Sequence, residues 1–339
     1  MKIRNPLASY LSPLFYLQRV STMKEFRITA ETAGQTSLKY ITKLLPLASL
    51  HLLHKSIRKK NITLNHKKCL GKEILNDNDT IQIWFSDETF SLFSKNIRKK
   101  RIPKQKKFDF ANHIIYEDAH IMIVNKPAGI LTQGDQSEEF TLNDALLNYC
   151  NTKESSTIKP SVCNRLDRNT SGLVLCGKTI RGLQTLNEII KTRRLIKTYR
   201  CIVWGSTKKE ETLNGFLLKD TTKNKVTIYD NEIKNSLPIK TKYKRISLIE
   251  KNGFPCSLLE VQLITGRAHQ IRAHLSYIGH PLLGDKKYGT KESIALSNEL
   301  KIKHQLLQAF SLTFPLLQGE LSYLSKKTFI LKNSIEDYI

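Results

Sequence analysis

Residues 164–172, NRLDRNTSG, place the carboxylate of Asp167 between Arg165 and Arg168, directly before an apolar run. A neighbouring guanidinium favours the ionised form of a carboxylate and can hold it in a fixed direction. An acid held in this way is suited to attack or to proton removal. A structural salt bridge at a turn is the ordinary alternative for an isolated Arg-Asp-Arg cluster, so the surrounding motifs must decide between the two.

Residues 172–179, GLVLCGKT, match the phosphate-binding pattern G-x-x-x-x-G-K-[ST]. A phosphate-binding loop needs an apolar strand before the first glycine and a flexible loop between the glycines. Here the preceding residues are polar, and LVLC between the glycines is itself a predicted strand. The order of elements is therefore inverted, and a nucleotide-hydrolysing enzyme is rejected.

The motif around Asp167 is one of a series that resembles the RluA family of pseudouridine synthases, in the RluC- and RluD-like branch that carries an S4 RNA-binding module. The family signature H-R-L-D-x-x-T-S-G corresponds to NRLDRNTSG, with Asn164 in place of His. A late family pattern corresponds to LQAFSLTFP, with Gln308 in place of His. The series contains NKPAG (125–129), NRLDRNTSG (164–172), TGRAHQIRAH (265–274), HPLLGDKKYG (280–289) and LQAFSLTFP (307–315).

The resemblance implies that Asp167 is the essential carboxylate in converting uridine to pseudouridine. It also implies that Arg267 pairs with Asp167, and that Tyr199 stacks on the extruded base where the C5 proton leaves. Asp167 must be ionised either to attack the sugar carbon C1′ or to remove a sugar proton. The sequence leaves both possibilities open.

The same resemblance implies a set of substrate contacts. Arg165 would fill the space left when the uridine is extruded from its stack. Lys126, Gln270 and Arg272 are predicted as substrate-binding or structural residues.

No metal and no cofactor is expected. His269 and His274 are five residues apart, which does not fit a helical zinc pair. The reaction is an isomerisation, so nothing has to be supplied to balance it.

The chain has 339 residues, a formal net charge of +25 and a pI of about 9.8. Such an excess favours a polyanion partner, most commonly nucleic acid, although a lysine-rich compositional bias is the alternative explanation. The six cysteines form no metal-binding or disulfide spacing, which indicates a reducing compartment. No apolar stretch approaches the roughly 20 residues of a membrane span. We expect a cytoplasmic monomer.

The N-terminal part is predicted to be a small RNA-binding module. Apolar spacing indicates two short helices in residues 36–60, the second capped by Ser49, followed by a strand around 81–83. The pattern resembles the S4 module. The second helix ends in a basic cluster suited to gripping an RNA backbone: Lys55, Arg58, Lys59 and Lys60.

The expected domain organisation has four parts. Residues 1–22 would be an extension, either disordered or a misassigned start, 23–94 the S4-like module, 95–108 a basic linker and 109–339 the catalytic domain. The catalytic domain is expected to be α+β, on a mixed and mostly antiparallel sheet. Its strands are predicted within 114–129, 173–176, 197–205 and 257–263, and its helices near 183–190 and 264–279.

The leading hypothesis is an RNA pseudouridine synthase acting on structured RNA. Large-subunit ribosomal RNA is the expected substrate, and tRNA is the alternative. A non-catalytic RNA-binding or ribosome-assembly factor would explain the basic charge equally well. Only the enzyme requires Asp167, Tyr199 and Arg267 together.

Overall fold

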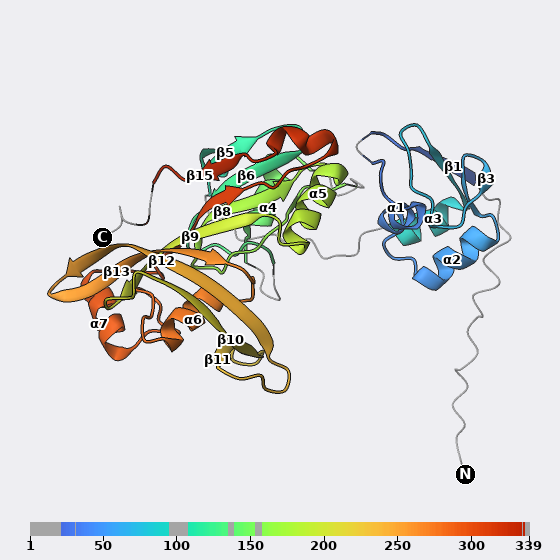
Figure 1. Ribbon diagram of the computed structural model, residues 1–339. Coiled ribbons are helices and arrows are strands. Elements are labelled where there is room, and N and C mark those ends of the chain that lie inside the picture. The colour runs from blue at the N-terminus through green and yellow to red at the C-terminus, as the bar shows by residue number, and fades with distance from the viewer. Residues whose placement is uncertain are drawn as a thin grey trace, which may run out of the picture. The chain divides into compact units, whose positions relative to one another are not determined.

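The computed structural model describes residues 22–30, 32–94, 108–134, 139–152, 158–333 and 335. The chain divides into two compact units, residues 1–100 and 101–339 (Figure 1). The predicted extension, apart from Thr22, and the predicted basic linker, apart from Phe108, lie outside the described residues.

The smaller unit is a four-stranded sheet covered by helices. The strand order is β1-β4-β2-β3, and all pairs are antiparallel. Thr36 and Ser49 cap α1 and α2 by accepting hydrogen bonds from backbone N–H groups three residues on, which confirms the predicted helix pair. Helix α3 was not predicted. The elements are β1 (Thr22–Arg27), α1 (Ser37–Leu44), α2 (Leu50–Arg58), β2 (Ile62–Leu64), β3 (Lys67–Lys68), β4 (Thr80–Phe85) and α3 (Asp87–Ser94).

The larger unit is built on an 11-stranded, mostly antiparallel sheet, which confirms the α+β prediction. The order is β11-β10-β12-β13-β9-β14-β8-β6-β5, with β15 paired to β14 and β7 to β8. The strands are β5 (Ile114–Glu117), β6 (Ile121–Lys126), β7 (Ser161–Val162), β8 (Ser171–Gly177), β9 (Ile196–Trp204), β10 (Glu210–Asp220), β11 (Lys225–Tyr229), β12 (Leu237–Lys251), β13 (Phe254–Leu263), β14 (Leu307–Thr313) and β15 (Thr328–Ile330).

The helices of the larger unit pack on different parts of this sheet (Figure 1). Helix α5 contacts β8, whereas α6 contacts β11 and β12. The predicted strand at 197–205 is β9, and its side chains at 199, 201 and 203 are buried in one core as expected. The helices are α4 (Leu142–Tyr149), α5 (Ile180–Lys191), α6 (Gln270–Tyr277) and α7 (Lys291–Glu299), with short 3-10 turns at η2 (Ala111–His113) and η3 (Gly319–Leu324).

Strands β8 and β14 meet in parallel at the middle of the sheet, where Gly172 lies opposite Ala309. Gly172 has φ +113°, and a Cβ there would lie 2.3 Å from the Ala309 carbonyl oxygen. Only glycine both adopts this positive φ without strain and has no Cβ to collide with the neighbouring strand. The segment with Asp167 immediately precedes β8, so this close contact fixes where that segment leaves the sheet.

Candidate active site

A single guanidinium joins two carboxylates at the centre of the candidate site. Nη1 of Arg272 donates to Oδ2 of Asp167 at 2.9 Å. The same side chain donates from Nε and Nη2 to the two oxygens of Asp285, at 2.7 and 2.9 Å. Asp285 is 1% exposed at its side chain, whereas Asp167 is 26% exposed. Hydrogen bonds with Asp285 and the charges of both acids raise the pKa of Arg272 against the opposing effect of burial, so the guanidinium stays charged. Asp167 is thus held at one oxygen and open to solvent.

The prediction that Arg267 pairs with Asp167 is wrong, because Arg272 makes this contact. Arg267 lies before α6, its side chain is exposed, and its backbone N–H donates to Oε1 of Gln270 at 3.0 Å. Arg272 lies within the helix and is 7% exposed. The helical turn that begins at Gln270 directs the second arginine of the motif, not the first, toward Asp167.

The loop that carries Asp167 is held by the NKPAG segment. Nζ of Lys126 donates to three carbonyl oxygens, those of Pro127, Ile130 and Arg168, each at 2.9 Å. The N–H of Gly129 donates to the same Arg168 carbonyl at 3.0 Å. Lys126 is 0% exposed, and burial lowers its pKa to about 7. The motif therefore ties the residue after Asp167 to the end of β6.

Thr132 and Gln305 hold the same loop on either side of Asp167. The Oγ1 of Thr132 donates to the Leu166 carbonyl at 2.8 Å and accepts from the Leu166 N–H at 3.1 Å. Nε2 of Gln305 donates to Oγ1 of Thr170 at 3.1 Å. Because bonds are made before and after Asp167, its backbone position is fixed from both directions.

Asn164 and Gln308, which replace the histidines of the family pattern, are both buried. Asn164 is 8% exposed, and its Oδ1 accepts the Leu175 N–H at 2.7 Å, which joins the loop to β8. Gln308 is 3% exposed, and its Nε2 donates to the Asn333 carbonyl at 3.3 Å. Its Oε1 is buried without a hydrogen-bond partner among the described residues. Asn164 is therefore a structural residue.

His269 and Tyr288 complete the surroundings of Asp167. Nε2 of His269 lies 3.8 Å from Oδ2 of Asp167, and its Nδ1 lies 2.9 Å from the Tyr288 hydroxyl. The guanidinium carbon of Arg272 lies 5.1 Å from the centre of the Tyr288 ring. Burial lowers the pKa of His269 and outweighs the charge of Asp167, which acts in the opposite direction; the charge of Arg272 lowers the pKa further. A neutral imidazole therefore adjoins the carboxylate at neutral pH.

Tyr199 lies in the core beside this site. It is 7% exposed on β9. Burial raises its pKa, and the charge of Asp167 raises it further. Tyr199 therefore lies close enough to Asp167 for the carboxylate charge to affect its pKa, and its phenol stays protonated at neutral pH.

Three predicted substrate contacts are made with the protein instead. Lys126, Gln270 and Arg272 are 0%, 2% and 7% exposed. Gln270 donates from Nε2 to the Lys240 carbonyl at 3.2 Å and to Oγ1 of Thr241 at 3.0 Å. Their polar atoms form hydrogen bonds with protein groups that hold the site together. The prediction that they bind substrate directly is therefore not supported.

The two arginines beside Asp167 differ in their environment. Arg165 is exposed, and its side chain forms no ion pair with any described carboxylate. Arg168 forms a salt bridge with Glu139, with a second bond from Nη2 at 3.1 Å. Arg165 is therefore available to a substrate, whereas Arg168 is bound to Glu139.

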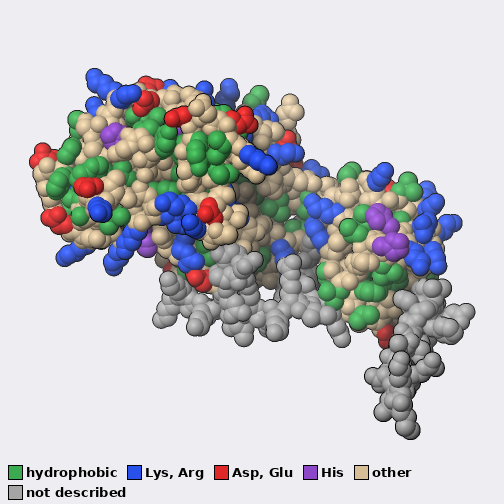
Figure 2. Space-filling model, turned by 90° about the horizontal axis from the view of Figure 1, so that it is seen from below, with side chains coloured by type: hydrophobic (Ala, Val, Ile, Leu, Met, Phe, Trp, Pro, Cys, Tyr) green, Lys and Arg blue, Asp and Glu red, His purple; other side chains and the backbone are tan. Residues whose placement is uncertain are grey.

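The basic residues predicted to contact RNA in the smaller unit lie at the end of α2 and just after it. Arg58, Lys59 and Lys60 are exposed, and Lys55 is half-buried. Figure 2 shows Lys, Arg and His side chains over the visible face of both units, with acidic side chains mainly on the larger one.

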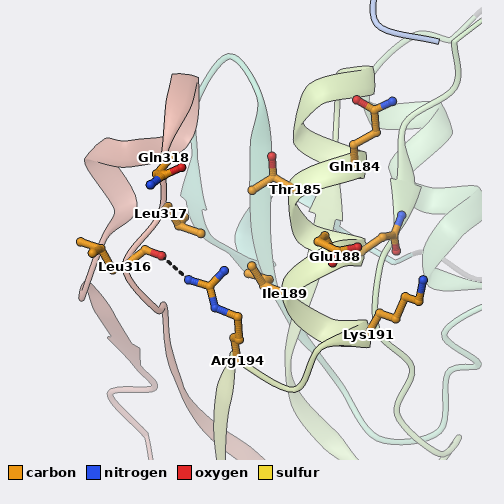
Figure 3. Close-up of a pocket in the computed structure, with 10 residues that line it drawn as sticks. Gln184, Thr185, Glu188, Ile189, Lys191, Arg194, Leu316, Leu317 and Gln318 are labelled. Carbon is orange, nitrogen blue, oxygen red and sulfur yellow. Dashed lines mark hydrogen bonds between the residues drawn. The ribbon is translucent and has the colours of Figure 1, made fainter.

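A groove of about 700 Å³ lies elsewhere on the larger unit, between α5 and residues 316–318 (Figure 3). Nη2 of Arg194 crosses it to the Leu316 carbonyl at 2.6 Å. None of the motif residues lines this groove. Among the described residues, no cluster of histidine, cysteine and acidic side chains could hold a metal ion, and no helix is long and apolar enough to span a bilayer.

Asp285 is the main residue that sequence reasoning missed. The sequence feature that could have indicated a buried Asp285 is its position directly after the apolar residues of HPLLGD. A carboxylate in an apolar context is rarely buried without a cation partner. No pattern, however, identified Arg272 as that partner.

Comparisons with known proteins identify the family. Residues 120–277 match the family model for RNA pseudouridylate synthase. The chain is 31% identical to an uncharacterized RNA pseudouridine synthase of Mycoplasma genitalium over 87% of this chain and 90% of that protein. It is 32% identical to the ribosomal large subunit pseudouridine synthase C of Rickettsia felis, over 76% of this chain and 83% of that protein.

Among solved structures, the human RNA pseudouridylate synthase domain containing 4 matches with a TM-score of 0.52 and 20% identity, covering 66% of this chain and 89% of that chain. That likeness concerns the fold alone. The motif order, the carboxylate held by Arg272 and the similarity along most of the sequence lead to one assignment: the chain belongs to the RluA family of RNA pseudouridine synthases.

Proposed function

We propose that this enzyme isomerises uridines of large-subunit ribosomal RNA, with Asp167 as its essential carboxylate. As a pseudouridine synthase it is an isomerase that acts on RNA. The observation that carries the residue assignment is the 2.9 Å bond from Arg272 to Asp167, whose side chain stays 26% exposed. The name of the Rickettsia felis relative supports the choice of ribosomal RNA.

The proposed chemistry needs one ionised acid and no oxidant. The N1–C1′ bond of the uridine breaks, the base turns, and a C5–C1′ bond forms. A proton leaves C5, and N1 gains one, so the atoms balance without a cofactor. Arg272 directs the Asp167 carboxylate through a charge-assisted hydrogen bond to one of its oxygens. Attack on C1′ and removal of a sugar proton both fit an acid that is open on one side.

Base extrusion would use Arg165. A uridine inside structured RNA must leave its stack before a carboxylate can reach its sugar. Arg165 is exposed two residues before Asp167. Its planar cation can occupy the vacated space beside the site.

Tyr199 would act as a neutral phenol. Because its raised pKa keeps it protonated, it can pack against the base or donate a hydrogen bond, but it is a poor acceptor of the C5 proton. Arg267 no longer has a proposed catalytic role, because Arg272 makes the contact with Asp167.

The smaller unit is proposed to be the S4-like RNA-binding module, residues 23–94, joined by a basic linker to the catalytic domain, residues 109–339. The exposed cations at the end of α2 support this role. We propose that the enzyme works as a cytoplasmic monomer without a cofactor.

Mapping pseudouridines in total RNA tests the function. Deletion of the gene should remove one or a few pseudouridines from large-subunit ribosomal RNA. The wild-type gene should restore them, and Asp167→Asn should not. Loss of sites only from tRNA would refute the ribosomal assignment. Unchanged pseudouridines after deletion would favour a non-catalytic RNA-binding factor, and restoration by Asp167→Asn would refute the role of this carboxylate.

A further inference from the structure

A hollow of about 300 Å³ lies near the candidate site, and its lining is basic. Its charged lining residues are Arg193, Lys240 and Arg267. No acidic residue lines it. None of the three cationic side chains forms an ion pair with a carboxylate in the part of the chain that the structure describes. The remaining wall is polar or apolar: Asn214, Gly215, Phe216, Pro238, Ile239 and Thr265.

Buried Gln270 builds the frame of this hollow. Its Oε1 accepts the Arg267 N–H at 3.0 Å and the Thr265 hydroxyl at 2.9 Å. Its Nε2 donates to the Lys240 carbonyl at 3.2 Å. Because one buried amide binds the backbone of both Arg267 and Lys240, the two cation-bearing segments are held in fixed positions around the hollow.

The third cation, Arg193, occupies a position that normally favours glycine. It has φ +57° just after α5, and its N–H donates to the Ile190 carbonyl at 3.2 Å. Glycine is the common residue at this left-handed position after a helix, because side chains there are strained. The side chain of Arg194, the next residue, donates to the Leu316 carbonyl, whereas Arg193 is one of the residues that line the hollow.

The hollow and the surroundings of Asp167 share one short stretch of chain. Arg267 is two residues from His269, and two residues span at most about 7 Å. Nε2 of His269 lies 3.8 Å from Asp167. The segment from Thr265 to Arg272 therefore contributes both to the lining of the hollow and to the surroundings of Asp167.

We propose that this hollow binds a backbone phosphate of the RNA strand that carries the target uridine. The proposal rests on the proposed function, because it places a neighbouring phosphate of the same RNA. Arg193, Lys240 and Arg267 supply the charge, and Gln270 positions two of them. Phosphate contacts set the register of a nucleic acid on a protein, so the hollow helps to select which nucleotide reaches Asp167.

The test uses Arg193→Gly in the full-length protein, with Lys301→Gly as a matched control. Lys301 also follows a helix with positive φ, 56°, and its N–H donates to the Asn298 carbonyl at 3.0 Å. Each change removes one cation and relieves the same backbone strain. Lys301 does not line the hollow. Both variants should therefore unfold at the same temperature as the wild-type protein or at a higher one.

RNA binding is measured in an Asp167→Asn background, so that no product forms, with a ribosomal RNA fragment that the wild-type enzyme modifies. Arg193→Gly should raise Kd roughly threefold to tenfold, and the slope of log Kd against log salt should fall by about 1. Lys301→Gly should change neither. In the active protein, Arg193→Gly should raise KM and change kcat less than about twofold at saturating RNA.

Lys240→Met and Arg267→Gln provide second variants, and each should reproduce the change in salt slope. If all three variants match Lys301→Gly in Kd and slope, or if Arg193→Gly lowers kcat with an unchanged Kd, the hollow does not bind a phosphate. Failure of the proposed function would look different, because the wild-type protein would then form pseudouridine in no fragment of large-subunit ribosomal RNA.

Discussion

Replacement of Asp285 by Asn tests whether the shared guanidinium positions Asp167. Asn keeps one acceptor oxygen, which can retain the bond from Nη2 of Arg272 and the backbone N–H donors of Lys287 and Tyr288. It replaces the other oxygen by an amide N–H₂ that faces Nε of Arg272, which now donates at 2.7 Å. The variant therefore loses one charge-assisted bond and one negative charge, with little change in volume.

The expected cost follows from the burial of this pair. Both side chains are less than a tenth exposed, 8% for Arg272 and 1% for Asp285, so solvent provides little compensation. Loss of one charge-assisted bond with an opposed donor should lower the free energy of unfolding by about 2–4 kcal/mol. Arg272 then has a single carboxylate partner, Asp167, and only one remaining bond to position 285, so its guanidinium is held less firmly. A shift of about 1 Å in a reacting group can reduce rate about 100-fold. We expect kcat to fall roughly 10- to 100-fold and KM to change less than about threefold.

The assay is tritium release from C5 of labelled uridine in RNA, under single-turnover and steady-state conditions, with unfolding measured in urea. Asp230→Asn is the control, because Asp230 is an exposed aspartate that accepts from the Tyr277 hydroxyl. If Asp285→Asn unfolds more easily but retains wild-type kcat at a temperature where it is folded, Asp285 only stabilises the fold. The positioning argument would then be refuted.

Two further substitutions test the loop that carries Asp167. Gly172→Ala should lower the free energy of unfolding by about 2–5 kcal/mol, because the new Cβ would meet the Ala309 carbonyl and the positive φ would be strained. The free energy is measured by urea unfolding. A difference from wild type of less than about 0.5 kcal/mol would contradict the close contact of β8 and β14. Lys126→Met should remove a pH dependence of stability. The buried Lys126 has a pKa of about 7, below the value of about 10.4 in an unfolded chain. The unfolded state therefore binds more protons between these values, and wild-type stability should rise with pH from about 7 to 10. Urea unfolding at several pH values should show this rise in the wild type and a flatter profile in Lys126→Met, and identical profiles would show that Lys126 does not titrate in this range.

Much of the fold could be predicted because local patterns and tertiary structure agree. The helix cap at Ser49 and the alternation along β9 are short-range signals that persist in the folded protein. Strands β10 to β12 were not predicted. Lys240, Lys242 and Lys244 alternate with buried residues on β12, but lysine-rich segments are common throughout this chain, and so the alternation did not distinguish a strand from a solvated loop.

The site was predicted in part. Resemblance identified the segment around Asp167 and the motif that contains its arginine partner. It assigned Arg267 where the structure has Arg272, because which arginine faces Asp167 depends on where α6 begins. His269, with φ +54°, precedes the helix and turns the chain, and such a turn leaves no clear sequence signal at a non-glycine residue. The part played by Asp285 depended on a contact with another element, which local sequence does not encode.

The order in which the site's parts occur along the chain has a consequence for protein synthesis. Asp167 is made early, but Arg272, Asp285, Gln305 and the β14 backbone against Gly172 are all made more than 100 residues later. A nascent chain that has exposed the smaller unit has therefore not yet formed the contacts that hold Asp167. Translation must pass β14 before the candidate site can assemble, and a product that ends before β14 would lack these contacts.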